Sequence, residues 1–112
     1  ATSKPSVFAR RILDHFKITP YFHTVYGSEL DGRLSDKGVL ISHIIEQDAL
    51  DPLASVMVGD RVYDIAGGKG NYVMSAAVAY GSGRGEVIHT AKPDVVFESI
   101  TDLTQALLFK FK

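Results

Sequence analysis

The stretch that decides the fold reads Ser55-Val56-Met57-Val58-Gly59-Asp60-Arg61-Val62-Tyr63-Asp64-Ile65. Its first four residues form a short apolar run that ends at Gly59, which is the pattern of a buried parallel strand. The residues from Arg61 to about Lys69 then predict a helix. A strand, a glycine turn and a helix in this order are typical of α/β proteins.

The same alternation continues on both sides of this stretch. Apolar spacing and turn residues predict further helices over about residues 5–17, 36–47, 86–91 and 101–109, and further strands over residues 22–26, 74–80 and 94–97. Ser35 or Asp36 is the expected N-cap of the second of these helices. The helix after Arg61 is expected to end at the glycines Gly67, Gly68 and Gly70. The pattern predicts a parallel sheet with helices on both faces, which binds ligands at the carboxyl ends of its strands.

Composition excludes several classes of protein. The 112 residues carry 12 Lys and Arg against 13 Asp and Glu, a formal net charge of −1 that gives no field for nucleic acid or an anionic membrane. The absence of cysteine excludes disulfides, thiolate metal sites and cysteine nucleophiles. The longest apolar runs fall well short of the ~18 residues that a membrane span needs. We therefore expect a soluble, cytoplasmic protein with no nucleic-acid or membrane partner.

Two carboxylates, Asp60 and Asp64, follow the expected strand and lie four residues apart. This spacing brings them near one another at the start of a helix, on the side where the strand ends. Hard oxygen ligands of this kind suit Mg²⁺, which proteins hold with one or two carboxylates plus waters and phosphate. The alternative is that Asp60 only caps the helix and Asp64 only faces solvent. Spacing alone leaves both interpretations open.

The order of short motifs along the chain strongly resembles the haloacid dehalogenase (HAD) superfamily of phosphatases. Residues 58–65 resemble the fourth motif of that family, Ala1-Thr2-Ser3-Lys4-Pro5 resembles the second, and Asp36-Lys37-Gly38 resembles the third. The spacing fits the phosphoglycolate phosphatase-like branch, and the likeness continues through Gly81-Ser82-Gly83, Pro93-Asp94 and the last helix. The resemblance covers essentially the whole chain.

This resemblance implies a Rossmann-like HAD core, a parallel sheet with flanking helices, and a role for each motif residue. Thr2, with Ser3 beside it, would bind phosphoryl oxygens, and Lys37 would place a cation on the phosphate and the nucleophile. Asp60 and Asp64 would hold Mg²⁺. The implied reaction is hydrolysis of a small phosphate monoester, phosphoglycolate as the first guess, through an aspartyl-phosphate. The alternative for Lys37 is a solvated lysine in the first turn of a helix.

One part of the family pattern is absent from this sequence. The nucleophile of the family comes from an Asp-x-Asp motif that precedes the second motif, and no Asp-x-Asp occurs in residues 1–112. The helical cap, which lies between the first and second motifs, is also absent. We therefore interpret residues 1–112 as the C-terminal part of a HAD-like core, with an incomplete sheet and no activity on its own. The missing strands would come from an N-terminal segment or from a second copy.

Two other functions stay open. One is a non-catalytic α/β module, derived from a HAD hydrolase, that binds phosphate or a partner. The other is a phosphosugar mutase similar to β-phosphoglucomutase.

Overall fold

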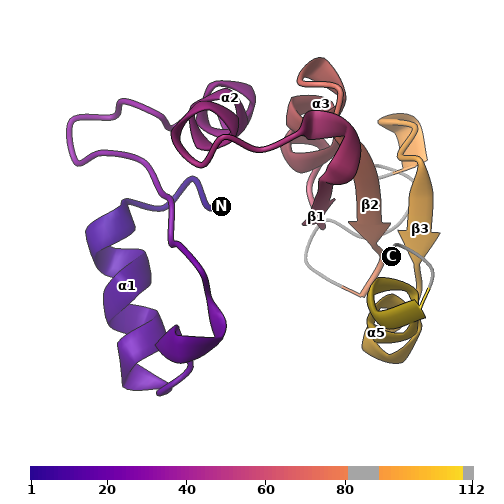
Figure 1. Cartoon of the computed structure of the whole chain (residues 1–112), viewed down its shortest axis with the longest axis horizontal. Coiled ribbons are helices and arrows are strands. Elements are labelled where there is room, and N and C mark those ends of the chain that lie inside the picture. Colours follow the sequence, from indigo (N-terminus) through magenta and orange to yellow (C-terminus); the bar gives the residue numbers. More distant parts are fainter. Residues whose placement is uncertain (81–88, 110–112) are drawn as a thin grey trace. The chain divides into compact units, whose positions relative to one another are not determined.

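A computed structural model describes residues 1–80 and 89–109 of the chain. The predicted loop at Gly81-Ser82-Gly83 and the first half (86–88) of the helix predicted over residues 86–91 lie outside these ranges. The chain divides into two compact units, Ala1–Leu50 and Asp51–Lys112. No helix in the described ranges is both long and apolar enough to span a bilayer. The elements are α1 (Ser6–His15), η1 (Thr19–Tyr21), α2 (Lys37–Gln47), η2 (Pro52–Ala54), β1 (Val56–Gly59), α3 (Val62–Gly70), β2 (Met74–Val78), β3 (Val95–Phe97) and α5 (Ile100–Phe109) (Figure 1).

The second unit contains the predicted parallel sheet. Its three strands lie in the order β1-β2-β3, and both pairs are parallel. Val58 is in register with Ala76, and Ala76 with Val95. Each parallel connection needs a crossover, and α3 supplies the one between β1 and β2. The α/β fold class predicted from the sequence is confirmed.

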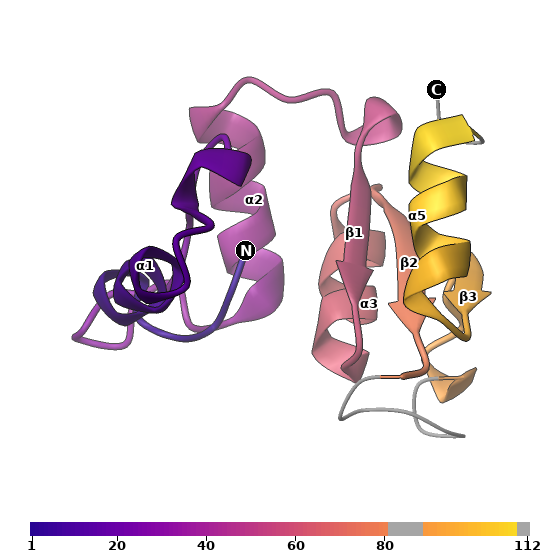
Figure 2. The same cartoon turned by 90° about the horizontal axis from the view of Figure 1, so that it is seen from below.

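Helices α3 and α5 cover opposite faces of this sheet (Figure 2). Leu103 and Ala106 of α5 pack in one apolar cluster with Ala76 and Val78 of β2. Ile65 of α3 packs in a second cluster with Ala77. Because successive side chains of a strand point to opposite faces, Ala76 and Ala77 belong to different layers. The prediction that helices cover both faces is therefore also confirmed.

The glycines of α3 act differently from the prediction. Gly67 and Gly68 do not end the helix, which continues to Gly70. Gly68 is buried, and a Cβ atom at this position would lie 3.1 Å from the Cβ of Met57 in β1. The glycine is therefore needed because the helix approaches the sheet closely, and this packing outweighs the weak helix propensity of glycine.

The first unit contains α1 and α2. The predicted cap of α2 is confirmed at Asp36, whose carboxylate accepts a hydrogen bond from Val39 N at 2.9 Å. Leu40 and Ile41 of this helix are buried, whereas α1 has no buried residue. The amphipathic pattern of α1 is thus present, but its apolar face is only partly covered by the described residues.

The strand predicted over residues 22–26 is wrong. Phe22 is extended, but the structure assigns no strand to this segment. Its continuation pairs with the start of the chain through a single parallel bridge between Pro5 and Ser28. A strand is defined by a continuous ladder with a neighbour. Within the described residues, the N–H groups of Thr24 and Tyr26 donate to no acceptor. Residues 22–26 thus have the composition of a strand, but no neighbouring strand in the described residues pairs with them.

Candidate active site

The carboxyl end of β1 holds the two predicted metal ligands. Asp60 follows the strand directly, and Asp64 lies in the first turn of α3. Asp64 is only 7% exposed, and its Oδ2 accepts a hydrogen bond from Arg61 N at 3.2 Å. The N-cap residue of α3 is Arg61 rather than Asp60. The alternative interpretation, in which Asp60 is the cap and Asp64 faces solvent, is therefore wrong.

Gly59 makes the position of Asp64 possible. A Cβ atom on Gly59 would overlap Oδ2, Cγ and Cβ of Asp64. The side chain of Asp64 therefore lies directly against the backbone at the end of β1, where a larger residue would displace it. The sequence predicted the turn at Gly59 but not this contact.

The donor set at this strand end fits Mg²⁺. No cluster of three or more His, Cys, Asp or Glu side chains that could hold a metal occurs in the parts of the chain that the structure describes. A protein cage for Zn²⁺ or Ca²⁺ is thus not formed by these residues. Two carboxylates are sufficient for Mg²⁺, because this ion keeps several waters and takes further oxygens from phosphate. Asp60 and Asp64 are the residues that would hold it.

Lys37, in the first unit, is buried. It is the first residue of α2 and is only 8% exposed. Its Nζ donates a hydrogen bond to the carbonyl oxygen of Ala1 at 3.4 Å. A cation is unfavourable at a helix N-terminus, and lysine is rarely buried in proteins. The solvated lysine considered from the sequence is therefore wrong, and the ammonium group lies beside the residue that precedes Thr2.

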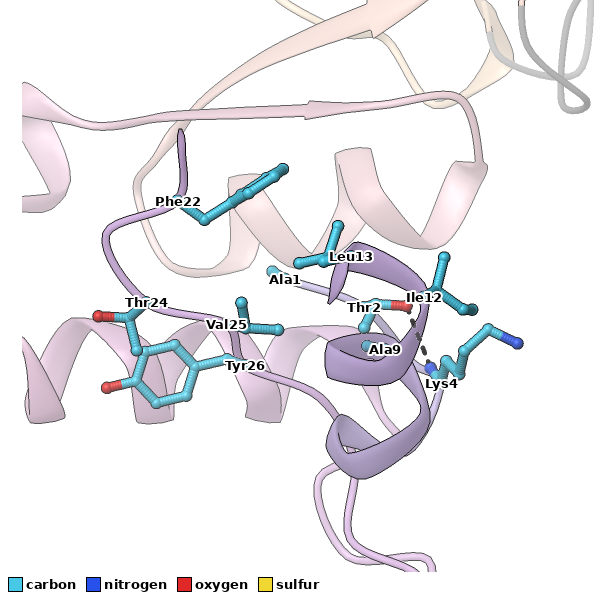
Figure 3. A pocket seen from close by; sticks show the side chains of 10 residues that line it. All are labelled: Ala1, Thr2, Lys4, Ala9, Ile12, Leu13, Phe22, Thr24, Val25 and Tyr26. Carbon is cyan, nitrogen blue, oxygen red and sulfur yellow. Dashed lines mark hydrogen bonds between the residues drawn. The ribbon is translucent and has the colours of Figure 1, made fainter. Parts of the chain in front are cut away.

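Thr2 and Ser3 lie in a turn at the start of the chain. Thr2 N donates to the carbonyl of Tyr26 at 3.0 Å, and the hydroxyl of Thr2 accepts from Lys4 N at 3.2 Å (Figure 3). Ser3 is exposed beside it. The structure thus brings the Thr2 segment and the ammonium group of Lys37 together within the first unit. Thr2, Ser3 and Lys37 thus lie in one unit and supply hydroxyl and ammonium donors of the kind that suits an anion.

A cavity of about 280 Å³ opens beside the start of the chain, where Ala1, Thr2 and Lys4 form part of its lining. Figure 3 shows the side chains that line it, which come from the start of the chain, from α1 and from residues 22–26. Most of the lining is apolar, with Ile12 and Leu13 on the helix side and Val25 on the opposite side. No local pattern predicts this cavity, because it lies along residues 22–26, for which the sequence predicts a strand.

Sequence reasoning also missed a polar contact at Tyr26. Its hydroxyl donates to Oδ1 of Asp48 at 2.8 Å, and its ring meets that of His43 edge to face at 5.8 Å. The hydrogen bond to Asp48, burial and the negative charge of Asp48 together raise the pKa of Tyr26. Residues 22 positions apart carry no local pattern that predicts such a contact.

Comparison with known proteins decides the family. The HAD-hydrolase-like family model matches residues 33–103. The chain belongs to the HAD-hydrolase-like family. The matched range includes Lys37, Asp60 and Asp64, and the resemblance inferred from the sequence is confirmed.

Three curated HAD relatives match almost the whole chain. A 5'-nucleotidase of Pseudomonas aeruginosa is 38% identical over 107 residues, which are 96% of this chain and 48% of the relative. The tyrosine-protein kinase PtkA of Mycobacterium tuberculosis is 36% identical over 109 residues, 96% of this chain and 38% of the relative. A phosphoglycolate phosphatase of Escherichia coli K12 is 31% identical over 106 residues, 95% of this chain and 42% of the relative.

A solved structure has the same HAD architecture. The crystal structure of a predicted phosphatase from Clostridium acetobutylicum matches with a TM-score of 0.91 and 38% identity. The match covers 95% of this chain and 49% of the solved one. The chain thus spans about half the length of the relatives that it matches.

Proposed function

We propose that residues 1–112 belong to a Mg²⁺-dependent phosphatase that hydrolyses a small phosphate monoester through an aspartyl-phosphate. The observation that carries this proposal is the buried ammonium group of Lys37, which donates to the carbonyl oxygen of Ala1, the residue before Thr2. A buried cation has a clear use in binding an anion. Membership of the HAD-hydrolase-like family supports phosphate as that anion.

Each residue then has a defined task. The charge of Lys37 and the hydroxyls of Thr2 and Ser3 bind and orient the phosphoryl oxygens, and positioning and charge neutralisation are the main needs of phosphoryl transfer. Asp60 and Asp64 hold Mg²⁺, which supplies further charge stabilisation when bound. Asp64 lies in the first turn of α3, where the helix dipole favours a negatively charged ligand.

The nucleophilic aspartate is not among residues 1–112, because they contain no Asp-x-Asp. We propose that it is supplied by polypeptide outside this sequence, or by a second copy, and that residues 1–112 alone are inactive. The length of the relatives supports this proposal, since the chain corresponds to about half of each. The cavity along residues 22–26 and the open N–H groups of Thr24 and Tyr26 offer a place for additional chain.

The substrate is proposed from the relatives. Phosphoglycolate is the first candidate, and a nucleoside 5'-monophosphate is the second, as the names of two of the relatives suggest. Transfer of phosphate to a protein tyrosine is the candidate from another class, since a third relative is a tyrosine-protein kinase. The balanced charge supports a small metabolite over nucleic acid, and a cytoplasmic location stays a prediction.

The test is a hydrolysis assay of the complete protein with Mg²⁺ against phosphoglycolate, nucleoside monophosphates and sugar phosphates. A parallel sample receives ATP and a tyrosine peptide. We expect Mg²⁺-dependent phosphate release from a small monoester and no peptide phosphorylation. Conversion of a sugar 1-phosphate to the 6-phosphate would favour the mutase. Absence of any turnover, together with phosphate binding, would favour the non-catalytic module.

A further inference from the structure

Gly27 occupies a place in the first unit where no side chain fits. It is buried, and a Cβ atom on it would lie 2.5 Å from the carbonyl oxygen of Lys4 and 2.7 Å from Ser6 N. Its φ is outside the left-handed region, which among the described glycines only Gly32 adopts. Space, and not backbone freedom, is therefore the reason for glycine. The obstructing atoms belong to the backbone, so they cannot rotate away as the end of a side chain can.

Three backbone hydrogen bonds surround Gly27 and join residues 2–6 to residues 26–28. Thr2 N donates to Tyr26 O at 3.0 Å, Ser28 N donates to Lys4 O at 3.1 Å, and Ser6 N donates to Ser28 O at 2.9 Å. We call these three bonds the Gly27 clamp. Ser28 is almost fully buried, at 3% exposure, so the two hydrogen bonds that its backbone makes are shielded from water at that end. Only a close approach of the two segments allows all three bonds.

The clamp holds the residues that we assign to phosphate binding. Thr2 takes part in it directly, and Ser3 lies between two of its members. The carbonyl of Ala1, which accepts the hydrogen bond from Lys37, is joined to the clamp through the adjacent peptide bond. A displacement of residues 2–6 would therefore move the hydroxyl donors and alter the hydrogen bond between Lys37 Nζ and the carbonyl oxygen of Ala1.

We propose that Gly27 is a positioning residue for phosphate binding. Its missing side chain lets residues 2–6 pass at hydrogen-bonding distance, and this sets where Thr2, Ser3 and Lys37 present their donors. Gly27 touches neither the phosphate nor the reacting atoms. The identity of the ligand, phosphate, rests on the proposed function. The geometry of the clamp rests on the hydrogen bonds alone.

The test uses the complete protein and two variants that open the clamp from opposite sides. Gly27→Ala places a methyl group against Lys4 and Ser6. Ser6→Pro removes the N–H that donates to Ser28, at the first position of α1, where proline is tolerated. The preceding Pro5 already has the extended backbone that a following proline requires, with φ −54° and ψ 134°. Ser6→Pro therefore keeps the proposal testable if Gly27→Ala does not fold.

Two readouts are measured, the binding of inorganic phosphate and the hydrogen exchange of the Thr2 and Ser28 amides. We expect both variants to weaken phosphate binding by about tenfold or more and to raise KM more than they lower kcat. The control is Ile41→Val, which shortens a buried side chain of α2 in the same unit and destabilises the protein modestly. It should leave phosphate affinity and both amides unchanged.

The outcomes separate this inference from the proposed function. Wild-type phosphate affinity in Gly27→Ala or in a folded Ser6→Pro protein would overturn the positioning role. An equal loss of affinity in Ile41→Val would also overturn it, because general destabilisation would then explain the effect. If the wild-type protein binds no phosphate, the proposed function fails, and the positioning role for phosphate fails with it. The amide exchange would then still report whether Gly27 maintains the clamp.

Discussion

Replacement of Gly59 by alanine tests whether the place of Asp64 is built into the end of β1. The added methyl group would overlap three atoms of the Asp64 side chain, including its Cβ, so a change of rotamer alone does not relieve the contact. The carboxylate must leave its buried place, and the hydrogen bond from Arg61 N at 3.2 Å is lost. We expect Mg²⁺ to bind far more weakly as a result.

The magnitudes predict that both stability and metal binding change. Loss of a carboxylate contact at a helix N-terminus costs about 1–2 kcal/mol. Overpacking costs about 1–3 kcal/mol more, because a shift of the backbone is needed to relieve the overlap with the Cβ atom of Asp64. The net loss of folding free energy is therefore about 2–5 kcal/mol. Loss of one of two carboxylate ligands should raise the half-saturating Mg²⁺ concentration by about tenfold or more.

The assay is a Mg²⁺ titration of hydrolysis by the complete protein, combined with hydrogen exchange of the Arg61 amide in the metal-free protein. Gly68→Ala is the matched control, because its methyl group would press on Met57 at 3.1 Å without reaching Asp64. We expect faster exchange of the Arg61 amide and weaker Mg²⁺ binding in Gly59→Ala alone. Unchanged exchange and an unchanged Mg²⁺ midpoint in Gly59→Ala would refute the reasoning.

Two further predictions concern other contacts. Asp94 accepts hydrogen bonds from the backbone N and hydroxyl of the fully buried Ser75 at 2.8 and 3.1 Å, so Asp94→Ala should cost about 1–3 kcal/mol in urea unfolding at pH 7. Hydrogen bonding from the Ser75 backbone lowers the pKa of Asp94, so its stabilisation is complete above the unfolded pKa of about 3.9 and is lost as pH falls through the lower folded value. The wild-type and variant stabilities should converge below about pH 4, and a gap that stays constant there would contradict this assignment. The second prediction concerns a protein with polypeptide before Ala1 that pairs with residues 22–26. The amides of Thr24 and Tyr26 should then be protected from hydrogen exchange while the amide of Val25 is not, because N–H groups alternate in direction along a strand. Equal protection of all three amides would contradict this pairing.

The sheet could be predicted from the sequence because its signals are local. The apolar run before Gly59 and the carboxylates after it fix a strand, a turn and a helix, and the structure places them so. The cap at Asp36 follows from the same kind of short-range chemistry. The family motifs singled out Lys37, which the structure shows to be buried with its ammonium group on the carbonyl of Ala1, and its role in phosphate binding stays a prediction.

What could not be predicted depends on contacts between residues distant in sequence. Residues 22–26 have β-branched and aromatic side chains, but a strand also needs a neighbour, and no local pattern reports whether one is present. The sequence around Gly68 is typical of a helix end, and only the close contact between α3 and Met57 of β1 explains a glycine inside the helix. The role of Gly27 depends on Lys4 and Ser6, which lie more than 20 positions away. Close backbone approaches of this kind leave no trace in propensity or periodicity.

The most direct test of the central claim is the Mg²⁺-dependent hydrolysis of a small phosphate monoester by the complete protein, its Asp60→Asn variant and residues 1–112 alone. We predict turnover by the complete protein, a loss of about 10²-fold or more in kcat/KM for Asp60→Asn, and no turnover by residues 1–112. Asparagine keeps the shape of Asp60 but removes its charge. Full activity of Asp60→Asn, or hydrolysis by residues 1–112 without a nucleophile from elsewhere, would contradict the account.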